Sequence, residues 1–149
     1  MSRDVEGVRR ALPLRYPYLM VDRVVEEGPN RVVALKNVTV NEPFFQGHFP
    51  EPLPAVMPGT LILEAMAQTA AFLLGNPSES EGYLVRVESA RFRRKVTPGD
   101  QLILTAQAVR RRGGLLQAEV LAAVGGEIVA EANLSLLAGE GGKGVEAAR

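Results

Sequence analysis

The chain has 149 residues with 17 basic and 17 acidic side chains, so its formal net charge is zero. This balance argues against general nucleic-acid binding, which needs a strong positive field, and 46% apolar content is typical of one folded globular domain. The chain has no cysteine, which excludes disulfides and thiolate chemistry, and its single histidine argues against a conventional zinc site.

The N-terminal part predicts a short polar helix followed by two strands. The helix is expected within residues 2–11, and the strands at 18–28 and 31–40 are rich in β-branched residues and joined by the turn "EGPNR". The first residues are charged and lack the apolar stretch of a secretory signal. No run reaches the roughly 18 apolar residues that a membrane span needs, so we expect a cytoplasmic location.

The centre of the chain predicts an ordered loop followed by one long helix. Five prolines within residues 41–59 disfavour regular structure there. The stretch "GTLILEAMAQTAAFLLG", residues 59–75, is dominated by good helix formers and ends at a glycine followed by Asn-Pro. Because this helix is apolar nearly all round, we expect other structure to wrap most of its surface.

The C-terminal part predicts four strands connected by hairpin-type turns. They are expected at residues 82–96, 100–112, 115–124 and 127–138. The fold class is therefore α+β, with a curved antiparallel sheet of five or six strands wrapped around one long central helix. We expect one domain over residues 1–138, a flexible tail over 139–149, and a homodimer that covers the remaining helix flank.

Glu64 is the only charged residue of the predicted central helix. Thr60, Glu64 and Gln68 recur every four residues, which puts them on one stripe. The carboxylate either faces water at an opening of the sheet or lies in an apolar slot with a function. A charge is costly to bury unless it is paired, so a glutamate within "LILEAMAQ" favours a functional role.

His48, the single histidine, lies in the stiff apolar stretch "PFFQGHFP". Histidine is often a packed, hydrogen-bonded ring, and that structural role stays open. Gly47 and Pro50 favour the alternative, because a stiff loop can hold one side chain in place for proton transfer.

The N-terminus of the predicted helix at Gly59 offers unpaired backbone N–H groups and the positive end of the helix dipole. An ordinary N-terminal glycine after a proline would look the same. Together, an imidazole, a carboxyl group and these donors suffice to remove a proton α to a carbonyl and to expel a β-hydroxyl as water.

Several motifs resemble one known family over about residues 11–138. They are "LPLRYPYLMVDRV", "NVTVNEPFFQGHFP", "VMPGTLILEAMAQTAAFLL", "ARFRRKVTPGDQLIL" and "RRRGGLLQAEVLAAVGGEIVAEANL". In these the chain resembles the (3R)-hydroxyacyl-acyl-carrier-protein dehydratases of the FabZ type, in which "GHFP" precedes "MPG" and "LEAMAQ". The resemblance implies a hot-dog fold and hydro-lyase activity in type II fatty-acid synthesis.

The resemblance also implies roles for four residues. His48 matches the family's catalytic histidine, and Glu64 matches its catalytic glutamate, which comes from the other subunit of the dimer. Gly59 matches the glycine whose N–H holds the thioester carbonyl, and Gln68 matches a glutamine that positions its neighbours. The family uses no metal or organic cofactor, acts on acyl chains on the phosphopantetheine of an acidic acyl carrier protein, and usually forms a trimer of dimers.

The basic stretch "RFRRK" offers Arg91, Arg93, Arg94 or Lys95 to steer an acidic carrier, although solvated strand charges would look the same. Two features depart from the family. Leu14 replaces a usual histidine, which predicts an altered pocket wall, and the segment 51–58 is about two residues longer than usual. The extra residues either bulge outward or reshape the pocket mouth.

Three other functions remain open from the residues and the resemblance. A hot-dog thioesterase would use Glu64 to activate water and would not need His48. A non-catalytic assembly module would need neither residue. A dehydratase that also isomerises the double bond usually has aspartate at the position of Glu64, which favours dehydration only. Acyl chain-length preference does not follow from the sequence.

Overall fold

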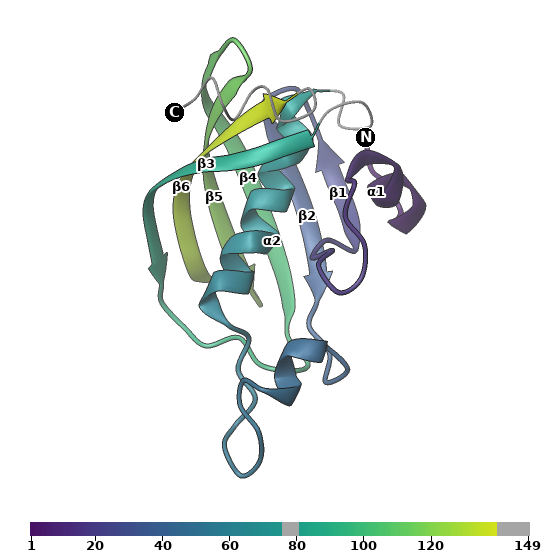
Figure 1. Cartoon of the computed structure of the whole chain (residues 1–149), viewed down its shortest axis with the longest axis vertical. Helices are drawn as coiled ribbons and strands as arrows, with labels where there is room; N and C mark the ends of the chain where they lie inside the picture. Colours follow the sequence, from purple (N-terminus) through teal and green to yellow (C-terminus); the bar gives the residue numbers. More distant parts are fainter. Residues whose placement is uncertain (76–80, 140–149) are drawn as a thin grey trace.

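A six-stranded antiparallel sheet curves around one central helix. The computed structural model describes residues 1–75 and 81–139. The strands are β1 (Arg23–Glu27), β2 (Arg31–Asn37), β3 (Glu81–Phe92), β4 (Gln101–Arg112), β5 (Leu115–Val124) and β6 (Glu127–Gly139), in the sheet order β1-β2-β4-β5-β6-β3. The helices are α1 (Val5–Ala11) and α2 (Gly59–Ala71), and Figure 1 shows α2 across the concave face of the sheet. This is the predicted hot-dog fold.

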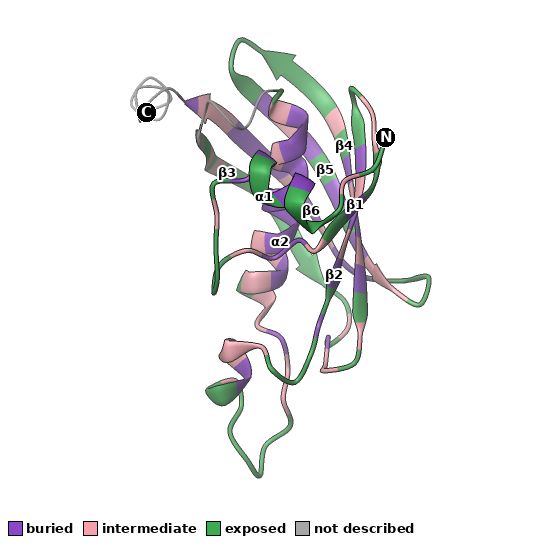
Figure 2. Cartoon of the chain, turned by 90° about the vertical axis from the view of Figure 1, so that its right-hand side faces the viewer, coloured by how far each residue is buried: buried purple, intermediate pink, exposed green. Residues whose placement is uncertain are grey.

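The sheet and helix bury each other because their apolar patterns match. Alternate residues of the central strands point inward and are fully buried, for example Leu102, Leu104 and Ala106 on β4. In α2 the middle turns are buried against these strands, and their small side chains, Ala65 and Ala70, let the backbones approach closely. In Figure 2 the buried residues, drawn in purple, lie on α2 and on the strands.

The two edges of the sheet differ in how they are covered. The N-terminal residues pair with β1, since Arg3 and Val24 exchange both backbone hydrogen bonds and Glu27 N–H donates to the Met1 carbonyl. The outer edge of β3 has no strand partner within the described residues. Leu84 and Val87 on β3 are exposed. A long, apolar, unpaired edge is a template for pairing with another chain.

The structure corrects several predicted boundaries. The strand predicted at 18–28 covers only Arg23–Glu27, because the amides of Tyr18 and Leu19 donate to the Arg15 carbonyl in a turn. The strands predicted at 31–40 and 82–96 end at Asn37 and Phe92.

The loop predicted over 41–59 contains one 3₁₀ turn, Pro43–Gln46, and a second such turn, Phe72–Leu74, ends α2. Strand β6 includes Gly139, so the last strand runs one residue past the predicted end of the domain. Residues 140–149 of the predicted tail lie outside the described residues. Within the described ranges, no helix combines the length and the apolar character needed to cross a membrane.

Candidate active site

A loop projects from the body of the molecule just before α2 (Figure 1), and its hydrogen bonds to Val56 place His48 at the neck of that loop. Its ring Nδ1 is 2.7 Å from the Val56 carbonyl oxygen, and Val56 N–H donates to the His48 carbonyl at 3.1 Å. A carbonyl only accepts hydrogen bonds, so Nδ1 carries a hydrogen, and in the neutral ring Nε2 then has the lone pair. The ring is half-buried and stacks on Phe49, with ring centroids 4.0 Å apart. His48 therefore presents a fixed basic nitrogen.

The turn before His48 is anchored by a buried ion pair. Lys36 is only 3% exposed, and its ammonium donates to both carboxylate oxygens of Glu42 at 3.1 and 3.2 Å. Phe45 is buried in the core next to Phe44, and the His48 amide donates to the Phe44 carbonyl. These contacts hold the backbone that carries the histidine.

Glu64 is half-buried in α2 with one polar neighbour. Its Oε1 accepts a hydrogen bond from Gln68 Nε2 at 2.9 Å, and it forms no ion pair within the described residues. Burial raises the pKa of the Glu64 carboxyl above its ordinary value, and the hydrogen bond from Gln68 opposes this shift. Glu64 is thus partly shielded from water, and this burial favours the neutral, proton-donating form of the acid.

Gln68 is buried and uses its whole side-chain amide. Nε2 donates to the Tyr18 carbonyl at 2.7 Å and to Glu64, and Oε1 accepts from the Met20 amide at 2.7 Å. The backbone partners fix which end of the amide is which, because Tyr18 offers an acceptor and Met20 a donor. Gln68 therefore donates an N–H to Oε1 of Glu64. The second carboxyl oxygen of Glu64, Oε2, is left to carry the proton.

Glu64 and Gln68 line a cavity of about 360 Å³ between α2, β3 and the chain after α1. Its walls are mainly apolar, from Leu12, Pro13, Leu14, Tyr18, Ala67, Ala71, Leu74, Gly82, Tyr83, Leu84 and Leu136. Leu14 lies in this wall, as predicted. His48 is not among the residues that line this cavity.

Gly59 begins α2 beside the other end of β3. The amides of Leu61 and Ile62 donate to the Pro58 carbonyl, and the Gly59 amide donates to no acceptor within the described residues. A Cβ at Gly59 would lie 3.4 Å from the Phe92 ring, so Gly59 lies directly beside this side chain. Gly59 and Val56 line a second cavity, of about 280 Å³, that does not contain Glu64.

Two further sets of polar residues were singled out in the sequence: the helix stripe that includes Thr60, and the basic stretch 91–95. Thr60 is exposed, so only Glu64 and Gln68 of the predicted stripe contact each other. Arg93 pairs with Glu131, and Arg94 pairs with Glu127. Sequence reasoning missed the carbonyls of Val56 and Tyr18 and the amide of Met20, because backbone groups have no residue-type signal.

Comparison with known proteins decides the family. The FabA-like domain model matches residues 12–133. The FabZ 3-hydroxyacyl-acyl-carrier-protein dehydratase of Streptococcus sanguinis is 49% identical over 92% of this chain and 99% of the relative. The chain belongs to the FabA-like family. The FabZ enzyme of Polynucleobacter asymbioticus is 52% identical over 89% of this chain and 90% of its own length, which places the chain with the FabZ type.

A solved structure shares the fold at low sequence identity. The dehydratase heterocomplex ApeI:P from Xenorhabdus doucetiae superposes with a TM-score of 0.79 at 17% identity, over 95% of this chain and 97% of that one. This likeness covers the whole hot-dog domain.

The burial of Glu64 predicts a pH-dependent stability. The folded chain holds the Glu64 proton more tightly than the unfolded chain, because its pKa is raised. Between the ordinary and the raised pKa the folded state binds more protons, so the contribution of Glu64 to stability is lost as pH rises. We expect Glu64→Gln to gain stability relative to the wild type with rising pH, measured by urea unfolding at a series of pH values.

The exposed Glu119 on β5 provides the control for this measurement. Glu119→Gln is expected to follow the wild-type pH dependence of the free energy of unfolding. Curves for Glu64→Gln that run parallel to the wild type would show that the Glu64 pKa is the same in both states.

Proposed function

We propose that this protein dehydrates (3R)-hydroxyacyl-acyl-carrier-protein to the trans-2-enoyl form in type II fatty-acid synthesis. Membership in the FabZ type supports the reaction class. The observation that carries the proposal is a complementary pair of groups. His48 has a free basic Nε2, and Glu64 is a half-buried acid whose raised pKa favours the protonated form.

These groups account for each step of the elimination. His48 Nε2 takes the proton from the carbon α to the thioester, and the negative charge that develops on the carbonyl oxygen is stabilised by the Gly59 N–H. Glu64 donates its proton to the 3-hydroxyl, the carbon–oxygen bond breaks, and water leaves. The site is restored when His48 loses its proton and Glu64 regains one.

A homodimer formed through the free edge of β3 would complete this site. Antiparallel pairing of two β3 strands places the Phe92 end of one strand beside the Glu81 end of the other. The Phe92 end lies next to Gly59 and to Val56, which holds His48. The opposite end, at Gly82–Leu84, lines the Glu64 cavity. The two-fold axis therefore brings His48 of one subunit to Glu64 of its mate.

A second apolar surface supports the association of such dimers into a trimer of dimers. An outer patch on the convex face of the sheet consists of one cross-strand row and two residues beside it. The row is Leu35, Ile103, Ala123 and Ile128, and Val33 and Leu121 lie two residues along β2 and β5 on the same face. Leu121 and Ile128 are each 40% exposed. This patch faces away from α2 and is separate from the β3 edge, so it provides a second interface.

The acyl carrier protein would approach near the Phe92 end of β3. Arg93 and Arg94 are engaged in ion pairs, whereas Arg91 and Lys95 are exposed and form none within the described residues. Arg91 and Lys95 are therefore the better candidates to steer an acidic carrier. A cytoplasmic location stays a prediction.

The reaction is tested by incubating the protein with a 3-hydroxyacyl thioester. We expect conjugated enoyl absorbance to appear without release of free thiol. Release of thiol alone would identify a thioesterase. No turnover of a carrier-linked substrate would support a non-catalytic assembly module instead.

The shared site is tested by complementation between two inactive variants. His48→Ala and Glu64→Gln, each alone, are expected to lose activity by a factor on the order of 100 or more, because each removes one proton-transfer group. When equal amounts are unfolded and refolded together, half of the dimers are mixed, and each mixed dimer has one intact site. Activity is then expected to reach about one quarter of the wild type.

A site contained within one chain would give a different result. The mixture would stay as inactive as its two components, since no subunit would carry both groups. Refolded wild type treated in the same way provides the reference activity.

The second interface is tested by Leu121→Asp. A buried, unpaired carboxylate in the outer patch is costly, so the variant is expected to sediment as a dimer where the wild type sediments as a hexamer. Val40→Asp, at a position 72% exposed and outside the patch, should keep the wild-type mass. An unchanged mass for Leu121→Asp would place the interface elsewhere.

A further inference from the structure

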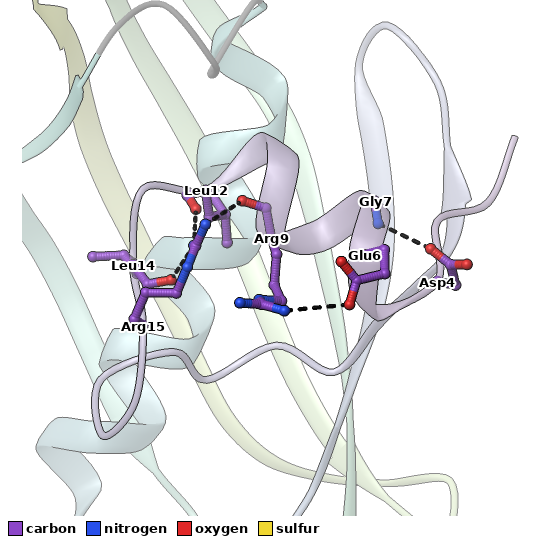
Figure 3. Close-up of polar contacts among 7 residues, drawn as sticks. All are labelled: Asp4, Glu6, Gly7, Arg9, Leu12, Leu14 and Arg15. Atoms are coloured by element: carbon purple, nitrogen blue, oxygen red, sulfur yellow. Dashed lines mark hydrogen bonds and ion pairs between the residues drawn. The ribbon is translucent and has the colours of Figure 1, made fainter.

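One arginine side chain holds the chain just after α1. The Arg15 guanidinium donates to three carbonyl oxygens: Nη2 to Arg9 at 3.1 Å, and Nη1 to Leu12 at 3.0 Å and to Leu14 at 2.6 Å (Figure 3). Arg9 lies in the last turn of α1, where carbonyls have no partner inside the helix. The planar guanidinium, with its fixed fork of donors, can join these groups at once.

The chain held by Arg15 is also a wall of the Glu64 cavity. We call residues 12–20 the wall segment, because Leu12, Pro13, Leu14 and Tyr18 line that cavity. The backbone of Arg15 contributes as well, since its carbonyl accepts from the amides of Tyr18 at 2.8 Å and Leu19 at 3.2 Å. Arg15 thus fixes both the start of the segment and its turn.

The far end of the wall segment supplies the backbone partners of Gln68. The Tyr18 carbonyl and the Met20 amide take two of the three hydrogen bonds of the buried Gln68 amide, and Glu64 takes the third. A shift of the wall segment would therefore rotate or release the Gln68 amide. The carboxyl group of Glu64 would lose the donor that orients it.

We propose that Arg15 is a positioning residue for the dehydration reaction and for acyl-chain selection, which rests on the proposed function. It holds the wall segment so that Leu12 and Leu14 face the acyl chain while Tyr18 and Met20 hold Gln68 against Glu64. Its side chain is exposed and contacts backbone carbonyls, so it acts through the wall segment. Lysine at this position keeps the charge but has no fork to join three carbonyls.

The first test measures catalysis with short and long 3-hydroxyacyl thioesters. Arg15→Met is expected to lower kcat by about tenfold, since small displacements of catalytic groups have large effects on rate. It should also change the ratio of kcat/KM between long and short substrates by at least about threefold, because the apolar wall that contacts the chain is no longer fixed. Arg15→Lys should recover part of the lost kcat and part of the wild-type ratio between long and short substrates.

The second test measures the wall segment without reference to activity. Hydrogen exchange at the Met20 amide, which donates to Gln68, should become faster by about tenfold in Arg15→Met, since the bond opens more often. This readout holds even if the wild type dehydrates no 3-hydroxyacyl thioester. A protected Met20 amide in the variant would overturn the positioning role, whereas an inactive wild type would overturn the proposed function.

Two control variants separate positioning from charge and from helix stability. Arg10→Met removes a neighbouring exposed arginine, and Asp4→Ala removes the N-cap of α1, whose carboxylate accepts from the Gly7 amide at 2.9 Å (Figure 3). Both are expected to keep the wild-type substrate ratio and Met20 protection. If Asp4→Ala reproduces the effects of Arg15→Met, loosening of α1 explains them and the proposal fails.

Discussion

The candidate site depends on one interaction, the hydrogen bond that the half-buried carboxyl group of Glu64 accepts from the amide of Gln68. An amide takes the place that a cation would have beside an ionised carboxylate. A nearby cation would lower its pKa and hold it ionised, whereas burial beside Gln68 favours the protonated acid. The buried Gln68 amide can donate to Glu64 at low cost only if its second N–H and its oxygen also have hydrogen-bond partners. Tyr18 and Met20 meet that requirement, so the chain after α1 becomes part of the site.

The unpaired edge of β3 is connected with the separation of the candidate reactive groups within one chain. One end of this strand lies beside Gly59 and the other lines the Glu64 cavity, so neither end carries a complete set of reactive groups. A two-fold axis across the strand joins unlike ends and produces two equal sites. In the proposed dimer, pairing along this edge would therefore both join the two subunits and complete the two sites.

The sequence predicted the fold well, because strands and turns leave local patterns, and the roles of the candidate reactive residues stay predictions. Strands β4, β5 and β6 lie within one residue of their predicted bounds, since glycine turns and alternating apolar residues delimit them. Residues 18–22 were wrongly assigned to a strand, because the backbone groups of residues 18–20 bond to Arg15 and Gln68, which no local pattern indicates. The proposed pairing of His48 with a mate's Glu64 leaves no local pattern in the sequence, and there it rests on the family resemblance alone.

The longer segment after His48 leaves the histidine geometry intact, because the loop is closed at its neck. Two hydrogen bonds between His48 and Val56 fix the ring and its backbone where the loop leaves and re-enters the body. Residues 49–54 beyond this neck are exposed, with Leu53 57% exposed, and they lie in none of the cavities described above. Within one chain the extra residues therefore extend outward, and the neck makes the orientation of His48 independent of loop length.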